Sequence, residues 1–302
     1  MNKFKKIIGM LAVASVVACT KEEVSIPDFD VSVNGTEYTT QDSVTFNFQG
    51  DADIVTFYSG ERGKMYEFKN RIEAVGKLEL NMETQVLFGS QANNLSVLVS
   101  TDFNNTYDST NVKAATWTDI TSRFTLSSAA AGASGARVVS SKVDVSDLAV
   151  QGKPMYFAYR YIGQPISPAS QRTWRIYAFN LTNTLPDNTV LSAATISTAG
   201  WLNVDFAHPT RWTIQATAPV LFYAPVSGTI TRSEDWAISK ALYPTTVNPD
   251  LGTAIKTFLD KPMRSFKYKF PSPGQYDVTF VANNANNQGQ ETKVKTIRLT
   301  IK

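Results

Sequence analysis

Short runs of apolar and β-branched residues, separated by turn residues, make up almost all of the chain. The C-terminal end shows the pattern most clearly, because Ile297, Leu299 and Ile301 alternate with polar residues, which predicts a strand with one buried face. Pro273 and Gly274 precede a second alternating run, and this pair favours a turn because proline fixes φ and glycine frees it. Such spacing is typical of sandwiches and barrels, so we predict an all-β fold.

Helical periodicity is scarce. Residues 252–260 place apolar side chains on one side of two helical turns, and residues 147–150 are long enough for a single turn.

The run 155–163 is apolar on both faces of an extended strand. It predicts an inner strand that is covered on both sides.

The segment 273–280 resembles the last hairpin of a PKD-type, immunoglobulin-like sandwich, in which a Pro-Gly-x-Tyr-x-Val turn and strand is usual. A sandwich needs earlier strands, and the start of the chain supplies three candidates: 31–33, 43–48 and 54–58. We therefore predict a discontinuous domain, 24–75 plus 262–302. The alternative is two separate partial β domains, which would leave sheet edges unpaired.

The intervening segment, 76–261, is predicted to form an inserted domain. Strand candidates with few helices recur along it, which fits a jelly-roll β-sandwich of two sheets. Its segments 117–121, 156–161 and 173–176 resemble strands of galactose-binding-like jelly rolls in Bacteroidetes surface lipoproteins.

Taken together, these motifs and three others make the chain similar to a lipoprotein family, the domain of unknown function numbered 5017. The other three motifs are 57–61, 233–239 and 273–280. That family has no settled activity, so the resemblance implies architecture rather than role. The resemblance to galactose-binding-like jelly rolls implies that a structural Ca²⁺ is possible. Asp102, Asn104 and Asp108 offer oxygen ligands for it, although an Asx-rich turn explains the same cluster.

The N-terminal residues have the features of an export signal. Residues 1–18 hold a short basic segment and an apolar run that is too short to span a bilayer, and the run closes on Cys19. This arrangement resembles a bacterial lipobox, which implies a signal peptide that is removed and a lipidated Cys19. Residues 19–23 then form a charged tether, and its Lys21, Glu22 and Glu23 resemble the signal for display on the outer face of the outer membrane. The alternatives are an ordinary secretory signal and a plain solvated tether.

Charge and composition exclude several classes of function. The chain has 302 residues and a formal net charge of +3, but three of its lysines lie in the predicted signal peptide, so the mature chain is formally neutral. A basic surface for nucleic acid therefore has no support. One Cys and one His cannot supply a disulfide framework or a typical Cys/His zinc site.

No catalytic set emerges from the sequence. The single histidine, His208, has no nucleophile motif to partner it. Asp205, Glu234 and Asp235 are candidates for glycan cleavage by paired carboxylates, but Glu234 and Asp235 point in opposite directions in an extended strand. We therefore expect a protein that is not an enzyme.

Glycan binding fits the composition better. Sugars lay apolar C–H faces on aromatic rings and offer hydroxyls to polar groups. Trp201 and Trp212 lie at predicted loop-to-strand edges and are the candidate stacking platforms, with core packing as the alternative. Arg160 and Arg175 lie in strands that we expect to be adjacent, and either could face a ligand or pair with an acid such as Asp119.

Trp174 and Trp117, by contrast, are predicted to be core residues. The sequence thus predicts a lipid-anchored protein of the outer-membrane surface that binds glycan and passes it to an importer complex. The alternatives are an adhesion or structural lipoprotein with a protein partner, and an unrecognised glycan hydrolase.

Overall fold

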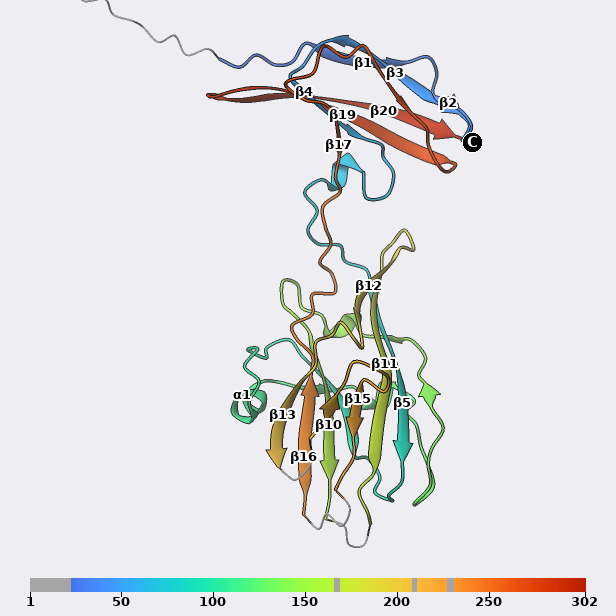
Figure 1. Cartoon of the computed structure of the whole chain (residues 1–302), viewed down its shortest axis with the longest axis vertical. Coiled ribbons are helices and arrows are strands. Elements are labelled where there is room, and N and C mark those ends of the chain that lie inside the picture. The colour runs from blue at the N-terminus through green and yellow to red at the C-terminus, as the bar shows by residue number, and fades with distance from the viewer. Residues whose placement is uncertain (1–22, 166–168, 208–210, 227–230) are drawn as a thin grey trace, which may run out of the picture. The chain divides into compact units, whose positions relative to one another are not determined.

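The computed structural model describes residues 23–165, 169–207, 211–226 and 231–302 (Figure 1). It is nearly all β, with 46% of residues in strands and 6% in helices, which confirms the predicted all-β sandwich class. Within the described ranges, no helix is long and apolar enough to cross a bilayer. Cys19, Lys21 and Glu22, on which the anchor and tether predictions rest, lie outside these ranges, as does His208.

The chain divides into two compact units. One combines residues up to Arg71 with Pro249–Lys302, and we call it the discontinuous unit. The other is Ile72–Asn248, the inserted unit. Residues 249–261, which we assigned to the inserted domain, thus belong to the discontinuous unit.

Two sheets form the discontinuous unit. The smaller has the order β1 (Phe29–Val33), β3 (Val44–Gly50), β18 (Ser265–Tyr268). The larger has the order β17 (Thr253–Lys256), β4 (Ile54–Tyr58), β19 (Gly274–Asn286), β20 (Gly289–Ile301), β2 (Glu37–Tyr38). Alternating side chains of both sheets fill the core, where the Phe46 ring lies 6.0 Å from Phe57 and 5.0 Å from Phe280 between ring centroids. A short 3-10 helix, η1 (Tyr66–Phe68), precedes the inserted unit.

The helix predicted over 252–260 is wrong, because strand β17 occupies this segment. Thr253 pairs with Phe57 of β4, and the Lys256 ammonium donates a hydrogen bond of 2.5 Å to the carbonyl of Ala52. Without β17, one edge of β4 would present unpaired backbone groups. Sheet pairing therefore outweighs the weak helical periodicity of this segment.

Two larger sheets form the inserted unit. The five-stranded sheet has the order β13 (Leu202–Ala207), β16 (Ser233–Ile238), β10 (Tyr156–Gly163), β6 (Leu95–Ser100), β7 (Thr118–Asp119). The seven-stranded sheet has the order β14 (Thr213–Ile214), β15 (Leu221–Tyr223), β11 (Thr173–Thr184), β5 (Lys77–Leu87), β8 (Val138–Val139), with β12 (Val190–Thr195) on β11 and β9 (Val143–Asp144) on β5. The main core lies between the two sheets, where Phe157 of β10 meets Phe179 of β11 edge to face at 5.2 Å.

The outer face of the five-stranded sheet is covered. Helix α1 (Ser109–Ala114) and the segment around it bury a second apolar cluster there, which includes Phe103, Val112, Tyr156 and Trp236. Strand β10 therefore has buried residues on both faces, as predicted for an inner strand. Two single-turn helices, η2 (Thr121–Arg123) and η3 (Ser146–Leu148), lie in connections, and η3 matches the turn predicted at 147–150.

Candidate functional site

Trp201 and Trp212 are core residues, so the prediction that they form exposed stacking platforms is corrected. Their side chains belong to the main core and are only 6% and 1% exposed. The Trp201 indole N–H donates to the carbonyl of Ile196, and its ring meets Phe179 edge to face. A strand end can point a side chain inward as well as outward, and here the neighbouring sheet covers both rings. Trp174 is also buried, as predicted.

Arg160 and Arg175 lie in different sheets, on β10 and β11, so the expectation of adjacent strands is wrong. Arg160 donates to the Ser96 hydroxyl and lies 3.8 Å from an Asp119 carboxylate oxygen, so it adopts the alternative of pairing with an acid. Its guanidinium also lies 5.5 Å from the Trp236 ring centroid. Contacts within the protein therefore account for the position of the Arg160 side chain.

The side chains predicted to bind Ca²⁺ are engaged in hydrogen bonds within their own loop and its surroundings. Asp108 caps helix α1 by accepting from the Asn111 N–H, and Asn104 donates to the Asn111 side chain. Asp102 accepts from Thr116 and Ser100; burial opposes its ionisation, but these bonds outweigh burial and lower the pKa of Asp102. Across the described ranges, no group of three or more His, Cys, Asp or Glu residues is placed to hold a metal ion. The alternative explanation, an Asx-rich turn, accounts for these contacts.

The outer face of the seven-stranded sheet has an unusual composition for an exposed surface. Strand register brings its outward-pointing residues into rows: Arg175 lies between Gln85 and Phe222, and Asn180 lies between Asn81 and Thr195. We call this set the outer face, and its members are Glu79, Asn81, Glu83, Gln85, Arg175, Tyr177, Asn180, Thr182, Ser192, Thr195 and Phe222. Most of them are half-buried amides, hydroxyls and rings rather than long solvated charges.

A β-bulge shapes the middle of the outer face. The register between β11 and β5 shifts between Ile176 and Ala178, and Tyr177 is the extra residue. The bulge leaves Tyr177 on the outer face and returns Phe179 to the core, where it is fully buried. Bulges of this kind often re-aim a side chain beside a functional site.

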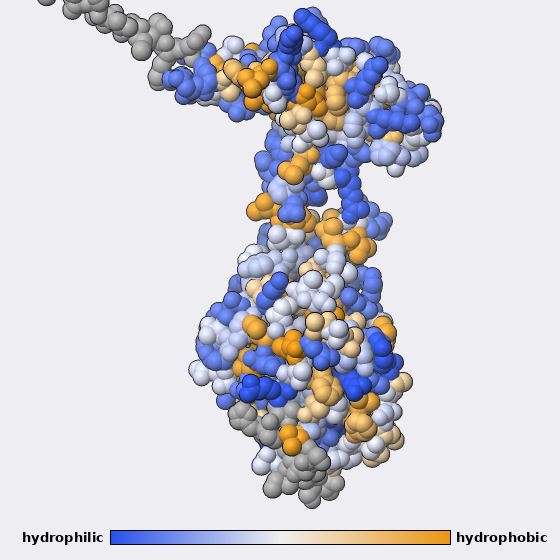
Figure 2. Space-filling model, viewed as in Figure 1, coloured by the Kyte–Doolittle hydropathy of each residue, from blue (hydrophilic) through white to orange (hydrophobic). Residues whose placement is uncertain are grey.

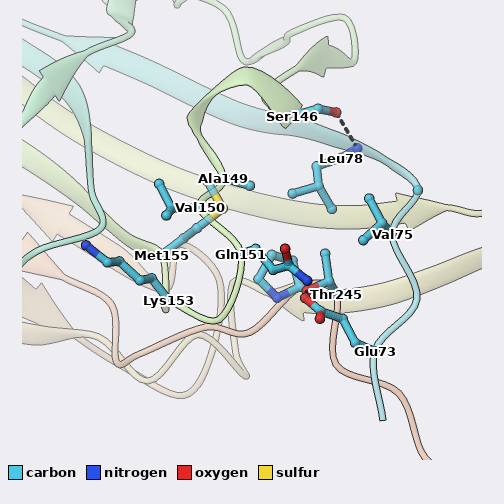
Figure 3. A pocket seen from close by; sticks show the side chains of 12 residues that line it. Glu73, Val75, Leu78, Ser146, Ala149, Val150, Gln151, Lys153, Met155 and Thr245 are labelled. Atoms are coloured by element: carbon cyan, nitrogen blue, oxygen red, sulfur yellow. Dashed lines mark hydrogen bonds between the residues drawn. The ribbon is translucent and has the colours of Figure 1, made fainter. Parts of the chain in front are cut away.

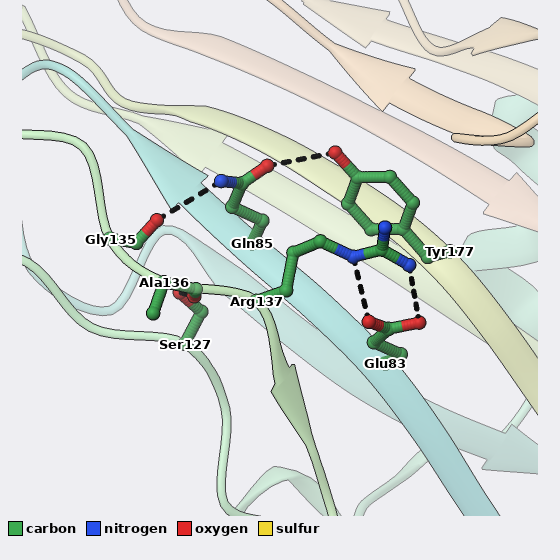
Figure 4. A network of polar contacts seen from close by, with 7 residues as sticks. All are labelled: Glu83, Gln85, Ser127, Gly135, Ala136, Arg137 and Tyr177. Atoms are coloured by element: carbon green, nitrogen blue, oxygen red, sulfur yellow. Dashed lines mark hydrogen bonds and ion pairs between the residues drawn. The ribbon is translucent and has the colours of Figure 1, made fainter.

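A network of polar contacts holds Tyr177 rigid (Figure 4). Arg137 makes two bonds of 2.7 Å to the Glu83 carboxylate, and its guanidinium carbon lies 3.8 Å from the centroid of the Tyr177 ring. The Tyr177 hydroxyl donates to the side-chain carbonyl of Gln85, whose amide N–H in turn donates to the Gly135 carbonyl. The arrangement gives the outer face a preformed, polar centre.

Comparison with known proteins places the chain in a family. The family model described as a domain of unknown function, DUF5017, matches residues 18–201, which is more than half of the chain. The chain belongs to the DUF5017 family. No curated protein and no solved structure matches it.

The DUF5017 match covers part of the outer face. Strands β5, β11 and β12 lie within the matched residues, whereas Phe222 on β15 lies beyond them. The match also spans the start of the discontinuous unit, β1 to β4. The match confirms the family resemblance that the sequence motifs indicated. It does not test the finer resemblances to PKD-like and galactose-binding-like domains.

Two hollows lie beside Lys153 in this DUF5017 chain. One has a volume of about 280 Å³ and is lined by apolar side chains, including Val75, Val150 and Met155, with Glu73 and Thr245 at one side and Lys153 at the other (Figure 3). The second, of about 270 Å³, is polar and includes Asp102 and Lys153. Neither hollow is lined by an aromatic ring on which a sugar could stack.

Two carboxyl groups meet at the edge of the five-stranded sheet. Asp205 of β13 lies opposite Asp235 of β16, and each has one buried oxygen without a hydrogen-bond partner. Burial raises the pKa of Asp235 to about 8, the Trp212 N–H opposes the rise, and the charge of Asp205 adds to it. Asp235 is 1% exposed, and Glu234 points away from it, as the strand alternation predicted. The pair therefore combines a buried carboxyl, Asp235, with a half-buried one, Asp205, whose carboxylate lies 3.5 Å from Arg211.

Sequence reasoning identified Arg175 but missed the rest of the outer face. Asn81, Asn180 and Thr182 lie in separate strands, and only their register brings them together. A signal was nevertheless present. Strand β11 alternates core residues with Arg175, Asn180 and Thr182, so its second face is polar but almost free of Lys and Glu.

Proposed function

We propose that this DUF5017 protein is a lipid-anchored, surface-exposed lipoprotein of the outer membrane that binds glycan without cleaving it. The observation that carries the proposal is the outer face, a strip of amides, hydroxyls and aromatic rings on a β-sheet. Amide side chains such as Asn81 and Asn180 can both donate and accept, which suits the hydroxyls of a sugar. Tyr177 and Phe222 supply apolar ring surface for the C–H faces of sugar rings.

The cellular part of the proposal rests on the sequence. The apolar run that ends at Cys19 supports a lipid anchor, and the charged residues at 21–23 support display on the cell surface of a Bacteroidetes-type bacterium. In this role the inserted unit, a galactose-binding-like jelly roll, carries the glycan site, and the PKD-like discontinuous unit acts as a spacer. An outer-membrane importer complex would receive the bound glycan.

Surface composition supports a polar ligand. On the face of the inserted unit that Figure 2 shows, hydrophilic and hydrophobic side chains alternate in small groups and do not merge into one broad apolar area. Large protein interfaces are usually marked by contiguous apolar patches of several hundred Å². The visible face of the unit has the mixed character that a hydrated ligand such as a glycan requires.

The test is a binding screen followed by a change in the outer face. The purified protein is assayed against a broad panel of polysaccharides by gel retardation and by calorimetry. Replacing both Asn81 and Asn180 by alanine removes two amides from the middle row and should weaken binding about tenfold or more, the expected cost of two lost polar contacts. Gln41→Ala, an exposed amide in the discontinuous unit, is the control and should bind normally.

Two results would reject the proposal. One is that no glycan in the panel binds the wild-type protein. The other is that the double variant, with an unchanged melting curve, binds as tightly as the wild type.

A further inference from the structure

Arg175 is a cation without an acidic partner in the middle of the outer face. It is half-buried, and its Nε atom is buried without a hydrogen-bond partner. Its guanidinium carbon lies 5.4 Å from the centroid of the Phe222 ring. In the part of the chain that the structure describes, no carboxylate forms an ion pair with Arg175.

Two other cations beside the outer face are paired with acids. Arg137 is held by both carboxylate oxygens of Glu83 at 2.7 Å, and Lys77 lies 2.9 Å from Glu79. Asp144 of β9, another acid of this sheet, lies opposite Glu79 in the strand register, whereas Arg175 lies opposite Gln85. Among the described residues that make up the outer face, Arg175 is therefore the cation without an ion pair, and its position is fixed by the central strand β11.

The neighbours of Arg175 on the two flanking strands provide no carboxylate for its guanidinium. Its cross-strand partners are Gln85 and Phe222, whereas an acid at either position would stabilise the sheet. The Gln85 side chain already accepts from Tyr177 and donates to Gly135. The guanidinium thus makes no hydrogen bond to a described residue, and Arg175 lies in the row of the outer face where we place the ligand.

We propose that Arg175 makes this surface selective for acidic glycans, through the carboxylate of a uronic acid residue. A guanidinium matches a carboxylate with two parallel hydrogen bonds, and such charge-assisted bonds are stronger than bonds to hydroxyls. Phe222, next to Arg175 on β15, packs against the ring of the same sugar. The amides of Asn81 and Asn180 bond the hydroxyls of its neighbours. This inference rests on the proposed function and adds the class of glycan.

The experiment compares two ligands that differ by methyl esterification of the carboxylates, which removes their charge. A homogalacturonan hexasaccharide and its methyl-esterified counterpart are titrated calorimetrically into the purified protein, and a sulfated oligosaccharide serves as a second anion. The wild type should bind the acidic form roughly tenfold to a hundredfold more tightly than the ester, the range expected for one charge-assisted contact. Added salt should reduce that preference.

Three variants complete the test. Arg175→Gln should abolish the preference while it retains binding of the ester, and Arg175→Lys should restore part of the preference because it keeps the charge without the planar fork. Lys113→Gln removes the same charge from α1 on the other sheet, and it should leave the preference unchanged. Melting curves of all variants show whether each remains folded.

The outcomes separate the inference from the proposed function. Equal affinity of the wild type for the acid and the ester would overturn the acidic selectivity and leave glycan binding in place. A preference that survives in Arg175→Gln, or binding of the sulfated ligand alone, would overturn the assignment to Arg175 and a carboxylate. If no saccharide in the broad panel binds, the proposed function fails, and the inference fails with it.

Discussion

Asp235 should make the inserted unit less stable as the pH rises. Burial raises its pKa from 3.8 to about 8 in the folded protein, whereas the unfolded chain releases the same proton near pH 3.8. Between these two values the folded state binds more protons than the unfolded state, so the free energy of unfolding falls with increasing pH. Below the window both states are protonated, and above it both are ionised, so the slope vanishes outside it.

The size of the effect follows from the same linkage. One proton retained only in the folded state changes the free energy of unfolding by at most about 1.4 kcal/mol per pH unit. From pH 5 to pH 8 the upper limit is therefore about 4 kcal/mol. Such a loss is a large part of the stability of a typical domain.

Asp235→Asn removes the titration without emptying the site. The asparagine carbonyl can still accept from the Trp212 N–H, and its amide can donate to Asp205 across the strand pair. Unfolding by urea at pH 5, 6, 7 and 8, at constant ionic strength, gives the slope for each protein. The variant should show a flatter slope and should exceed the wild type in stability at pH 8.

The control is Asp260→Asn, an exposed aspartate whose pKa is lowered by hydrogen bonds from Thr257. It titrates below the window, so its slope should equal that of the wild type. Groups that titrate alike in wild type and variant cancel in the comparison. Parallel slopes for the wild type and Asp235→Asn would refute the reasoning.

Three further changes test the remaining arguments. Trp212→Ala empties a core site and should cost roughly 3–5 kcal/mol of stability, measured by chemical denaturation; a loss of under 1 kcal/mol would contradict the core assignment. Gly50→Ala should destabilise the discontinuous unit, because φ is +76° and a Cβ there would lie 1.7 Å from the Asp28 carbonyl oxygen; Gly35→Ala, with open space around it, is the matched control, and equal melting temperatures would count against the argument. Cys19→Ala should leave the protein unlipidated in metabolic labelling with a fatty-acid analogue, and label retained in the variant would disprove the anchor.

The local parts of the fold could be predicted from the sequence. Alternation in residues 296–302 and the double-sided apolar run at 155–163 correspond to β20 and β10, because the period of side chains along a strand depends on that strand alone. The segment 252–260 was misread as a helix because its pairing with β4 depends on residues almost 200 positions away. The periodicity of a segment carries no information about strand partners that are so distant in the sequence.

The site could be predicted only in part, for the same reason. Arg175 was identified from its strand, but its neighbours Gln85 and Phe222 come from β5 and β15, and the bulge at Tyr177 is a property of the ladder. Trp201 and Trp212 were misassigned because the sequence shows that a residue opens a strand but not which face is covered. The meeting of Asp205 and Asp235 likewise depends on the register of β13 with β16.

The cover over the five-stranded sheet affects how many ligands one molecule can hold. Because Phe103, Val112 and Trp236 bury that sheet's outer side, the outer face of the seven-stranded sheet is the open sheet surface among the described residues of the inserted unit. In the proposed role each molecule is therefore monovalent at this surface. A long polysaccharide could still be held firmly by many anchored copies, because the first contact raises the effective concentration of the chain at neighbouring copies. Retention would then depend on the density of the protein in the membrane more than on the affinity of a single site.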